Sequence, residues 1–152
     1  EEVNKKQKNK LDDEGIKRVH DFKHFEKQFH ENTSNYYTSN YESTYIIEKE
    51  NLKIGIACIN SSWRCYDSAK DKGKLIVGEH QISSAYEQIK DCRVKIAVMH
   101  HSLEHLVPFD IEAIEPYLDR FNILLLGHDH SNKLAQKSNF KGTTLVSMDL
   151  DC

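Results

Sequence analysis

The apolar positions near the amino end of the chain recur at helical spacing. At about 100° per residue they fall on one stripe, which predicts an amphipathic helix over Leu11–Phe29. The phenylalanines on this stripe indicate that the helix packs against a core. The charged and amide residues of Glu1–Lys10 predict a mobile segment before the helix, and the polar run Asn32–Tyr41 predicts a loop after it. The stripe consists of Leu11, Val19, Phe22, Phe25 and Phe29.

Short apolar runs along the rest of the chain predict strands. The run Lys53–Ile59 has apolar or small residues on both faces, which is typical of a strand that is covered on both sides. Thr144–Met148 alternates between apolar and polar residues, as an ordinary half-buried strand does. The other predicted strands are Thr44–Glu48, Leu75–Val77, Val94–Met99 and Ile123–Leu126.

Two further helical stripes lie between these strands. Pro116 falls inside the second stripe, which predicts a kinked helix or two short turns there. Strands that are separated by helical patterns favour an α/β fold with parallel neighbours in the sheet, and we expect residues 11–152 to belong to a single domain. The two stripes consist of Ile82, Ala85, Tyr86 and Ile89, and of Ile111, Ile114 and Leu118.

The composition narrows the class of protein. At 152 residues, with 38% hydrophobic and 30% charged residues, the chain suits one soluble domain or a large piece of one. A net charge of -3 gives no basic field, so nucleic acid is not an expected partner. The sequence has no apolar run of about 18 residues and no leader pattern, so we expect no membrane partner and a cytoplasmic location. The four cysteines form no CxxC pair, which argues against a disulfide framework or a thiolate zinc site.

Two of the apolar runs end directly in histidines. Val94–Met99 is followed by His100 and His101, and Ile123–Leu126 is followed by Gly127, His128, Asp129 and His130. Ligands of open α/β sheets bind outside the carboxyl ends of the strands, and imidazole is the commonest side-chain ligand of metals. A single histidine here could equally make a hydrogen bond at a strand end. The Gly-His-Asp-His run, with His-His at a second strand end, favours a metal site, and Gly127 is expected to supply the sharp turn.

This arrangement resembles the last two motifs of the calcineurin-like metallophosphoesterases. The similarity covers about residues 46–134 and includes the stretches Ile54–Trp63 and Gly78–Gln81. It implies half of a four-layer αββα sandwich, with a mixed sheet and flanking helices. In the family, two divalent ions (manganese, iron, zinc or similar) bind phosphate oxygens and activate a bridging hydroxide that hydrolyses phosphomonoesters or phosphodiesters.

The resemblance assigns roles to particular residues. It implies that His100 and His128 bind one metal ion and that His130 binds the other. It places His101 and Asn60 near the phosphate ester substrate.

Three motifs of the family are absent from this chain. They are Asp-x-His, Gly-Asp-x-x-Asp and Gly-Asn-His-Asp, and no glycine of this sequence is followed by aspartate or asparagine. These motifs supply the bridging carboxylate, the asparagine ligand and the histidine that protonates the leaving group. The resemblance therefore implies a C-terminal half-domain that is inactive without its N-terminal half and that covers its exposed core by self-association or with its own first helix.

Two other functions stay open at this point. The chain could be a non-catalytic remnant of the fold that serves as an interaction module. It could also be a mononuclear zinc hydrolase that uses only its own histidines, although the sequence offers no evident carboxylate activator for that reaction. Both alternatives share the predicted α/β fold, so the fold alone does not separate them.

Overall fold

The structure is a computed structural model that describes residues 17–67, 70–128, 135–140 and 143–147. Several sequence predictions therefore fall outside the described residues. These are the Glu1–Lys10 segment, the first part of the Leu11–Phe29 helix, His130, and Met148 at the end of the last predicted strand.

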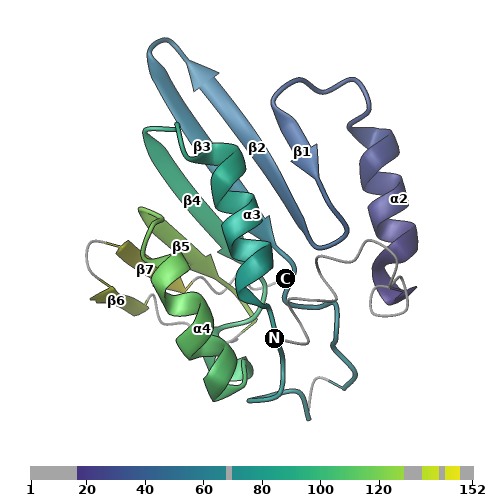
Figure 1. Cartoon of the computed structure of the whole chain (residues 1–152), viewed down its shortest axis with the longest axis vertical. Coiled ribbons are helices and arrows are strands. Elements are labelled where there is room, and N and C mark those ends of the chain that lie inside the picture. Colours follow the sequence, from purple (N-terminus) through teal and green to yellow (C-terminus); the bar gives the residue numbers. More distant parts are fainter. Residues whose placement is uncertain (1–16, 68–69, 129–134, 141–142, 148–152) are drawn as a thin grey trace.

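The described strands form one mixed sheet in the order β1-β2-β3-β4-β5-β7-β6 (Figure 1). The β3–β4, β4–β5 and β5–β7 pairs are parallel, whereas the β1–β2, β2–β3 and β6–β7 pairs are antiparallel. The predicted α/β fold with a mixed sheet and flanking helices is confirmed. The strands are β1 Tyr36–Thr38, β2 Glu42–Lys49, β3 Leu52–Ile59, β4 Val94–Met99, β5 Ile123–Leu126, β6 Ala135–Phe140 and β7 Thr143–Ser147.

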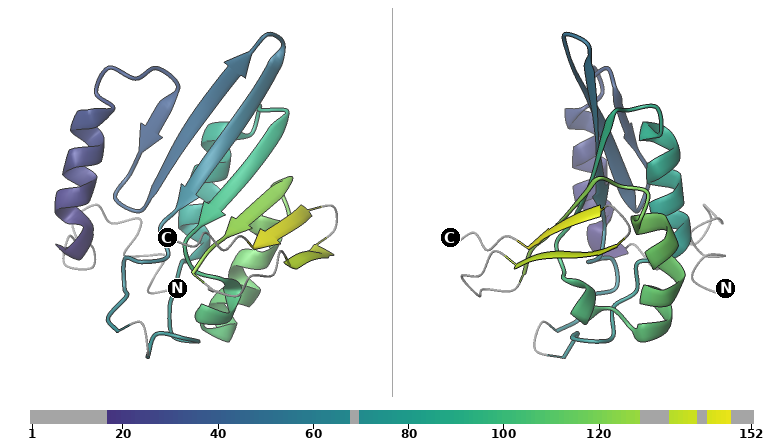
Figure 2. Two further views of the ribbon diagram at one scale, coloured as in Figure 1. Left: turned by 180° about the vertical axis from the view of Figure 1, so that it is seen from behind. Right: turned by 90° about the vertical axis from the view of Figure 1, so that its left-hand side faces the viewer.

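Helices α3 (Glu79–Ile89) and α4 (Pro108–Leu118) cover one face of the sheet (Figures 1 and 2). Apart from Lys53 and Lys95 near the amino ends of β3 and β4, the side chains that β3, β4 and β5 turn toward these helices are buried, in the alternation typical of a strand. Helix α3 lies very close to β3, because a Cβ added at Gly55 would meet Ile89 Cβ at 2.5 Å. The core includes Ala57, Ile59, Ile82, Ile89, Ala97, Ile114, Phe121 and Leu124.

The opposite face of β3, β4 and β5 is apolar but carries no described helix (Figure 2). Its side chains are paired across the three strands, so that Ile56 lies beside Ile96 and Ile96 lies beside Ile123. Each of them is only half buried, in contrast to the fully buried residues on the helix side. The residues of this open face are Ile54, Ile56, Cys58, Val94, Ile96, Val98, Ile123 and Leu125.

The described part of the first predicted helix is α2 (His20–Phe29), which lies beyond the edge strand β1 (Figure 1). The prediction that its phenylalanines pack against the core is wrong. Phe22, Phe25 and Phe29 are 62%, 58% and 70% exposed, respectively. The helix instead buries Lys23 and Glu26, which bond to each other and to polar side chains of β1 and β2.

Three smaller expectations also need correction. The polar segment predicted as a loop over Asn32–Tyr41 contains β1, because Tyr36 pairs with Tyr45 of β2 and their rings are in tilted contact, with centroids 5.0 Å apart. Leu75 forms only an isolated bridge to Leu106 instead of a strand over Leu75–Val77. Of the two alternatives for the stripe that contains Pro116, the two short turns are wrong, because α4 is one helix with Pro116 close to its carboxyl end, while the kink stays a prediction.

Candidate metal centre

The parallel pairing of β4 and β5 sets the position of the histidines. Met99 pairs with Leu126 at the carboxyl ends of these strands, so the residues that follow emerge at the same edge of the sheet. The Gly127 N–H donates to the carbonyls of both Met99 and His100, at 3.2 and 3.1 Å. These bonds hold the two strand ends together beyond the last paired residues.

Gly127 serves close approach and not the sharp turn that the sequence suggested. A Cβ at this position would lie 3.2 Å from the carbonyl oxygen of His100, which is tighter than side-chain carbons normally approach. The left-handed backbone conformation occurs one residue later, at His128, where φ is 77°. Such a conformation costs a non-glycine residue about 1–2 kcal/mol and clusters at functional sites.

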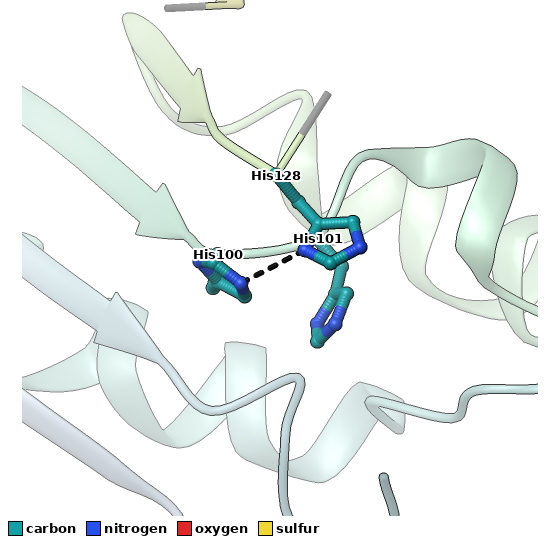
Figure 3. Close-up of side chains that lie close together, drawn as sticks. All are labelled: His100, His101 and His128. Carbon is teal, nitrogen blue, oxygen red and sulfur yellow. Dashed lines mark hydrogen bonds between the residues drawn. The ribbon is translucent and has the colours of Figure 1, made fainter. Parts of the chain in front are cut away.

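The imidazoles of His100 and His128 meet at this edge (Figure 3). His100 Nε2 lies 3.0 Å from His128 Nδ1. The predicted convergence of the two strand ends is confirmed for this pair, whereas His130 lies outside the described residues. With His101, the pair offers three ligand atoms within 4.8 Å of one another, and the described residues hold no other such group of three.

The geometry of the pair suits a shared metal ion. Zinc–imidazole bonds are about 2.0–2.1 Å long and zinc sites are tetrahedral, so two nitrogens on one ion are about 3.3 Å apart. The His100–His128 separation of 3.0 Å is close to this value, so a small movement of the two rings would admit an ion. In the metal-free chain the same distance allows one ring to donate a hydrogen bond to the other. No described carboxylate joins the group, so these imidazoles would fill only part of a coordination shell.

His101 is enclosed more tightly than the other two. Its ring packs against those of His100 and His128 with centroids 4.7 Å away in both cases. Burial, together with the neighbouring His100, His128 and His105, lowers the pKa of His101 to about 4. The ring is therefore neutral at pH 7.

A fourth imidazole belongs to the cluster. His105, in the short 3-10 helix η2 (Leu103–His105), is buried, and its ring centroid lies 4.7 Å from that of His128. Its Nδ1 atom lies 3.0 Å from the Ser102 hydroxyl. The sequence pattern assigns no role to His105, and only the fold shows that it packs on the candidate site.

Asn60 directly follows β3, which is the neighbour of β4 in the sheet, so it lies at the same edge as the histidines. Its Oδ1 accepts a hydrogen bond from the Ser62 N–H at 2.9 Å. The side-chain amide of Gln81 accepts from the Asn60 backbone N–H and donates to the Asn60 carbonyl. The Asn60 side chain thus shapes the turn that carries Ser61. Its predicted place beside the substrate stays a prediction.

The contact between Ser61 and His101 could not be predicted from the sequence. The Ser61 hydroxyl lies 2.8 Å from His101 Nδ1 and accepts the His101 backbone N–H at 3.2 Å. Both residues are almost fully buried. A serine after an apolar strand carries no signal of this kind, because its partner lies 40 residues away.

Comparisons with protein-family models, with curated proteins and with solved structures found no match. The resemblance to metallophosphoesterases therefore depends on the residues of this chain and on their arrangement. Among the described residues there is also no helix that is both long and apolar enough to cross a membrane.

Proposed function

We propose that the chain is the C-terminal half of a two-metal phosphoesterase domain of the calcineurin-like class. The observation that carries this proposal is the meeting of His100 and His128 within 3.0 Å at the ends of two parallel strands. The Gly-His-Asp-His and His-His runs place these residues where the resemblance requires them. A cytoplasmic location and a phosphomonoester or phosphodiester substrate belong to the same proposal.

In this proposal His100 and His128 hold one divalent ion, and His130 contributes to a second. Bound divalent ions supply Lewis-acid charge that polarises phosphoryl oxygens and activates water. The protein's own residues orient the ester: His101, which is neutral at pH 7, stands beside the ligand pair, and Asn60 ends the neighbouring strand. Manganese, iron and zinc all suit imidazole together with carboxylate ligands.

The open face of β3, β4 and β5 supports the half-domain proposal. A four-layer sandwich requires a second sheet on this face, and its apolar, half-buried side chains suit such a contact. Exposed apolar patches of this kind are normally covered by another surface. Without the second sheet, we expect the isolated chain to self-associate through this face, since α2 leaves it uncovered in the described residues.

The isolated chain is expected to show no phosphatase activity above background. Three imidazoles shared over two ions leave each ion short of its usual four to six ligands, and no described carboxylate completes the group. The measurement is hydrolysis of an aryl phosphate ester by the purified 152-residue chain with Mn²⁺, Fe²⁺ or Zn²⁺. Metal-dependent turnover that is lost in His128→Ala would contradict the half-domain proposal.

The same assay on the parent protein tests the activity itself. A longer protein that contains these residues and supplies the three missing motifs upstream should hydrolyse the ester with at least one of the ions. His128→Ala should abolish this turnover, whereas His24→Ala on the exposed part of α2 should leave it unchanged. A parent protein that lacks those motifs, or that is inactive with every ion, would favour the interaction module instead.

A further inference from the structure

The loop after β3 and the end of β4 meet at a buried serine–histidine contact. Ser61 is 1% exposed and His101 is 5% exposed. The Ser61 Oγ atom has two partners, the backbone N–H of His101 at 3.2 Å and the ring Nδ1 of the same residue at 2.8 Å. One hydroxyl therefore fixes both the backbone and the ring of His101.

The hydrogen atoms at this contact favour one tautomer of the ring. The backbone N–H can only donate, so Ser61 Oγ accepts it. The hydroxyl hydrogen then has a single acceptor within the described residues, which is the lone pair of His101 Nδ1. If Nδ1 carried the proton instead, the buried hydroxyl hydrogen would have no acceptor, and such groups are costly. The neutral ring is thus held with its proton on Nε2.

We propose that Ser61 is a positioning residue that keeps His101 in the Nε2–H tautomer, so that His101 donates a hydrogen bond to a phosphoryl oxygen and does not bind the metal. This inference rests on the proposed function and assigns a task to the third imidazole of the cluster. With Nδ1 bonded to Ser61 and Nε2 protonated, neither ring nitrogen of His101 offers a free lone pair to an ion. His100 and His128 then remain as the metal-binding pair.

The Nε2 proton has only a weak acceptor in the described structure. Cys65 Sγ lies 3.7 Å from His101 Nε2, and thiol sulfur accepts hydrogen bonds poorly. An anionic phosphoryl oxygen is a much stronger acceptor, so exchanging one for the other favours ligand binding. Within the proposed function this acceptor is an oxygen of the phosphoryl group, whatever alcohol the phosphate carries.

The tautomer can be measured without metal, substrate or mutation. In a two-dimensional ¹⁵N–¹H NMR spectrum of the chelator-treated chain at pH 7, His101 should show a protonated Nε2 and an unprotonated Nδ1. Ser61→Ala should remove this preference, and Ser61→Thr, which keeps the hydroxyl, should restore it. A protonated Nδ1 in the wild-type chain would overturn the proposal, as would a Ser61→Ala spectrum that matches the wild type.

Binding of inorganic phosphate tests the donor role. For the chain loaded with Zn²⁺, Ser61→Ala should weaken phosphate affinity about tenfold, while Zn²⁺ affinity changes less than twofold. Ser83→Ala on α3 is the matched control and should change neither. A large loss of Zn²⁺ affinity in Ser61→Ala would identify His101 as a ligand and refute the proposal. If the wild-type chain binds no phosphate, the donor role fails. The tautomer then decides whether Ser61 positions the ring, and the assay on the parent protein decides the proposed function.

Discussion

Replacing His128 with alanine is expected to lower the affinity of the chain for Zn²⁺ by about 100-fold or more. His128 supplies one of the two nitrogens that lie 3.0 Å apart, and loss of residues that merely support a metal ligand already costs about 10–100-fold. Isothermal titration calorimetry of the purified chain gives the affinity directly. His24→Ala, on the exposed side of α2, removes an imidazole far from the strand ends and should leave the affinity unchanged.

A second substitution separates lost binding from lost folding. The left-handed conformation at His128 suits asparagine better than alanine, so His128→Asn should preserve the turn. An ion that binds only the folded chain raises its unfolding temperature. Adding EDTA to the zinc-loaded protein should therefore lower the unfolding temperature of the wild type but not that of His128→Asn. Equal zinc stabilisation of both proteins would show that the ion binds elsewhere.

The second large effect is expected at the buried pair that docks α2. Lys23 Nζ lies 2.5 Å from Glu26 Oε2, and Ser43 joins both by donating to Glu26 Oε1 at 2.6 Å and accepting from Lys23 at 2.9 Å. Removing one partner of a buried ion pair typically costs about 3–5 kcal/mol because the other charge is left alone. Glu26→Ala is therefore expected to destabilise the packing of α2 against the sheet by a free energy of this order.

Hydrogen exchange of the α2 amides, together with urea unfolding, measures this loss. Phe25→Ala is the matched control, since the side chain one position away is 58% exposed and should contribute less than about 1 kcal/mol. The double variant Lys23→Met, Glu26→Leu removes both charges and should recover much of the stability. If Phe25→Ala destabilised α2 more than Glu26→Ala, the observed orientation of the helix would be wrong.

The same pair makes the docking of α2 sensitive to acid. Burial raises the pKa of Glu26, but hydrogen bonds from Lys23 and Ser43 outweigh this effect and bring the pKa below its ordinary value of 4.5. Because the folded-state pKa is lowered, the stabilisation is complete above about pH 4.5 and is lost as the pH falls through the folded-state pKa.

The parts of the fold that follow local patterns could be predicted from the sequence. The run Ile123–Leu126 coincides with β5, and Val94–Met99 coincides with β4. The histidine pair was predictable for the same reason, because His100 and His128 directly follow these strands and parallel strand ends share an edge.

The parts that depend on distant partners could not be predicted. The periodicity of α2 shows an apolar stripe, but it cannot show that Lys23 and Glu26 neutralise each other and allow the polar side to be buried. Strand β1 lacks an apolar pattern and forms because β2 offers it a partner and an aromatic contact. Likewise, the role of Ser61 depends on a ring that belongs to another strand end.

The proposed function depends above all on a metal ion held between His100 and His128. Crystals of the chain grown with Zn²⁺ and measured at the zinc absorption edge locate the ion directly. We expect an anomalous peak about 2.0–2.1 Å from both His100 Nε2 and His128 Nδ1, with His101 Nε2 outside bonding distance. Zinc peaks only at other histidines, or an empty strand-end edge at a Zn²⁺ concentration that saturates the chain, would contradict it.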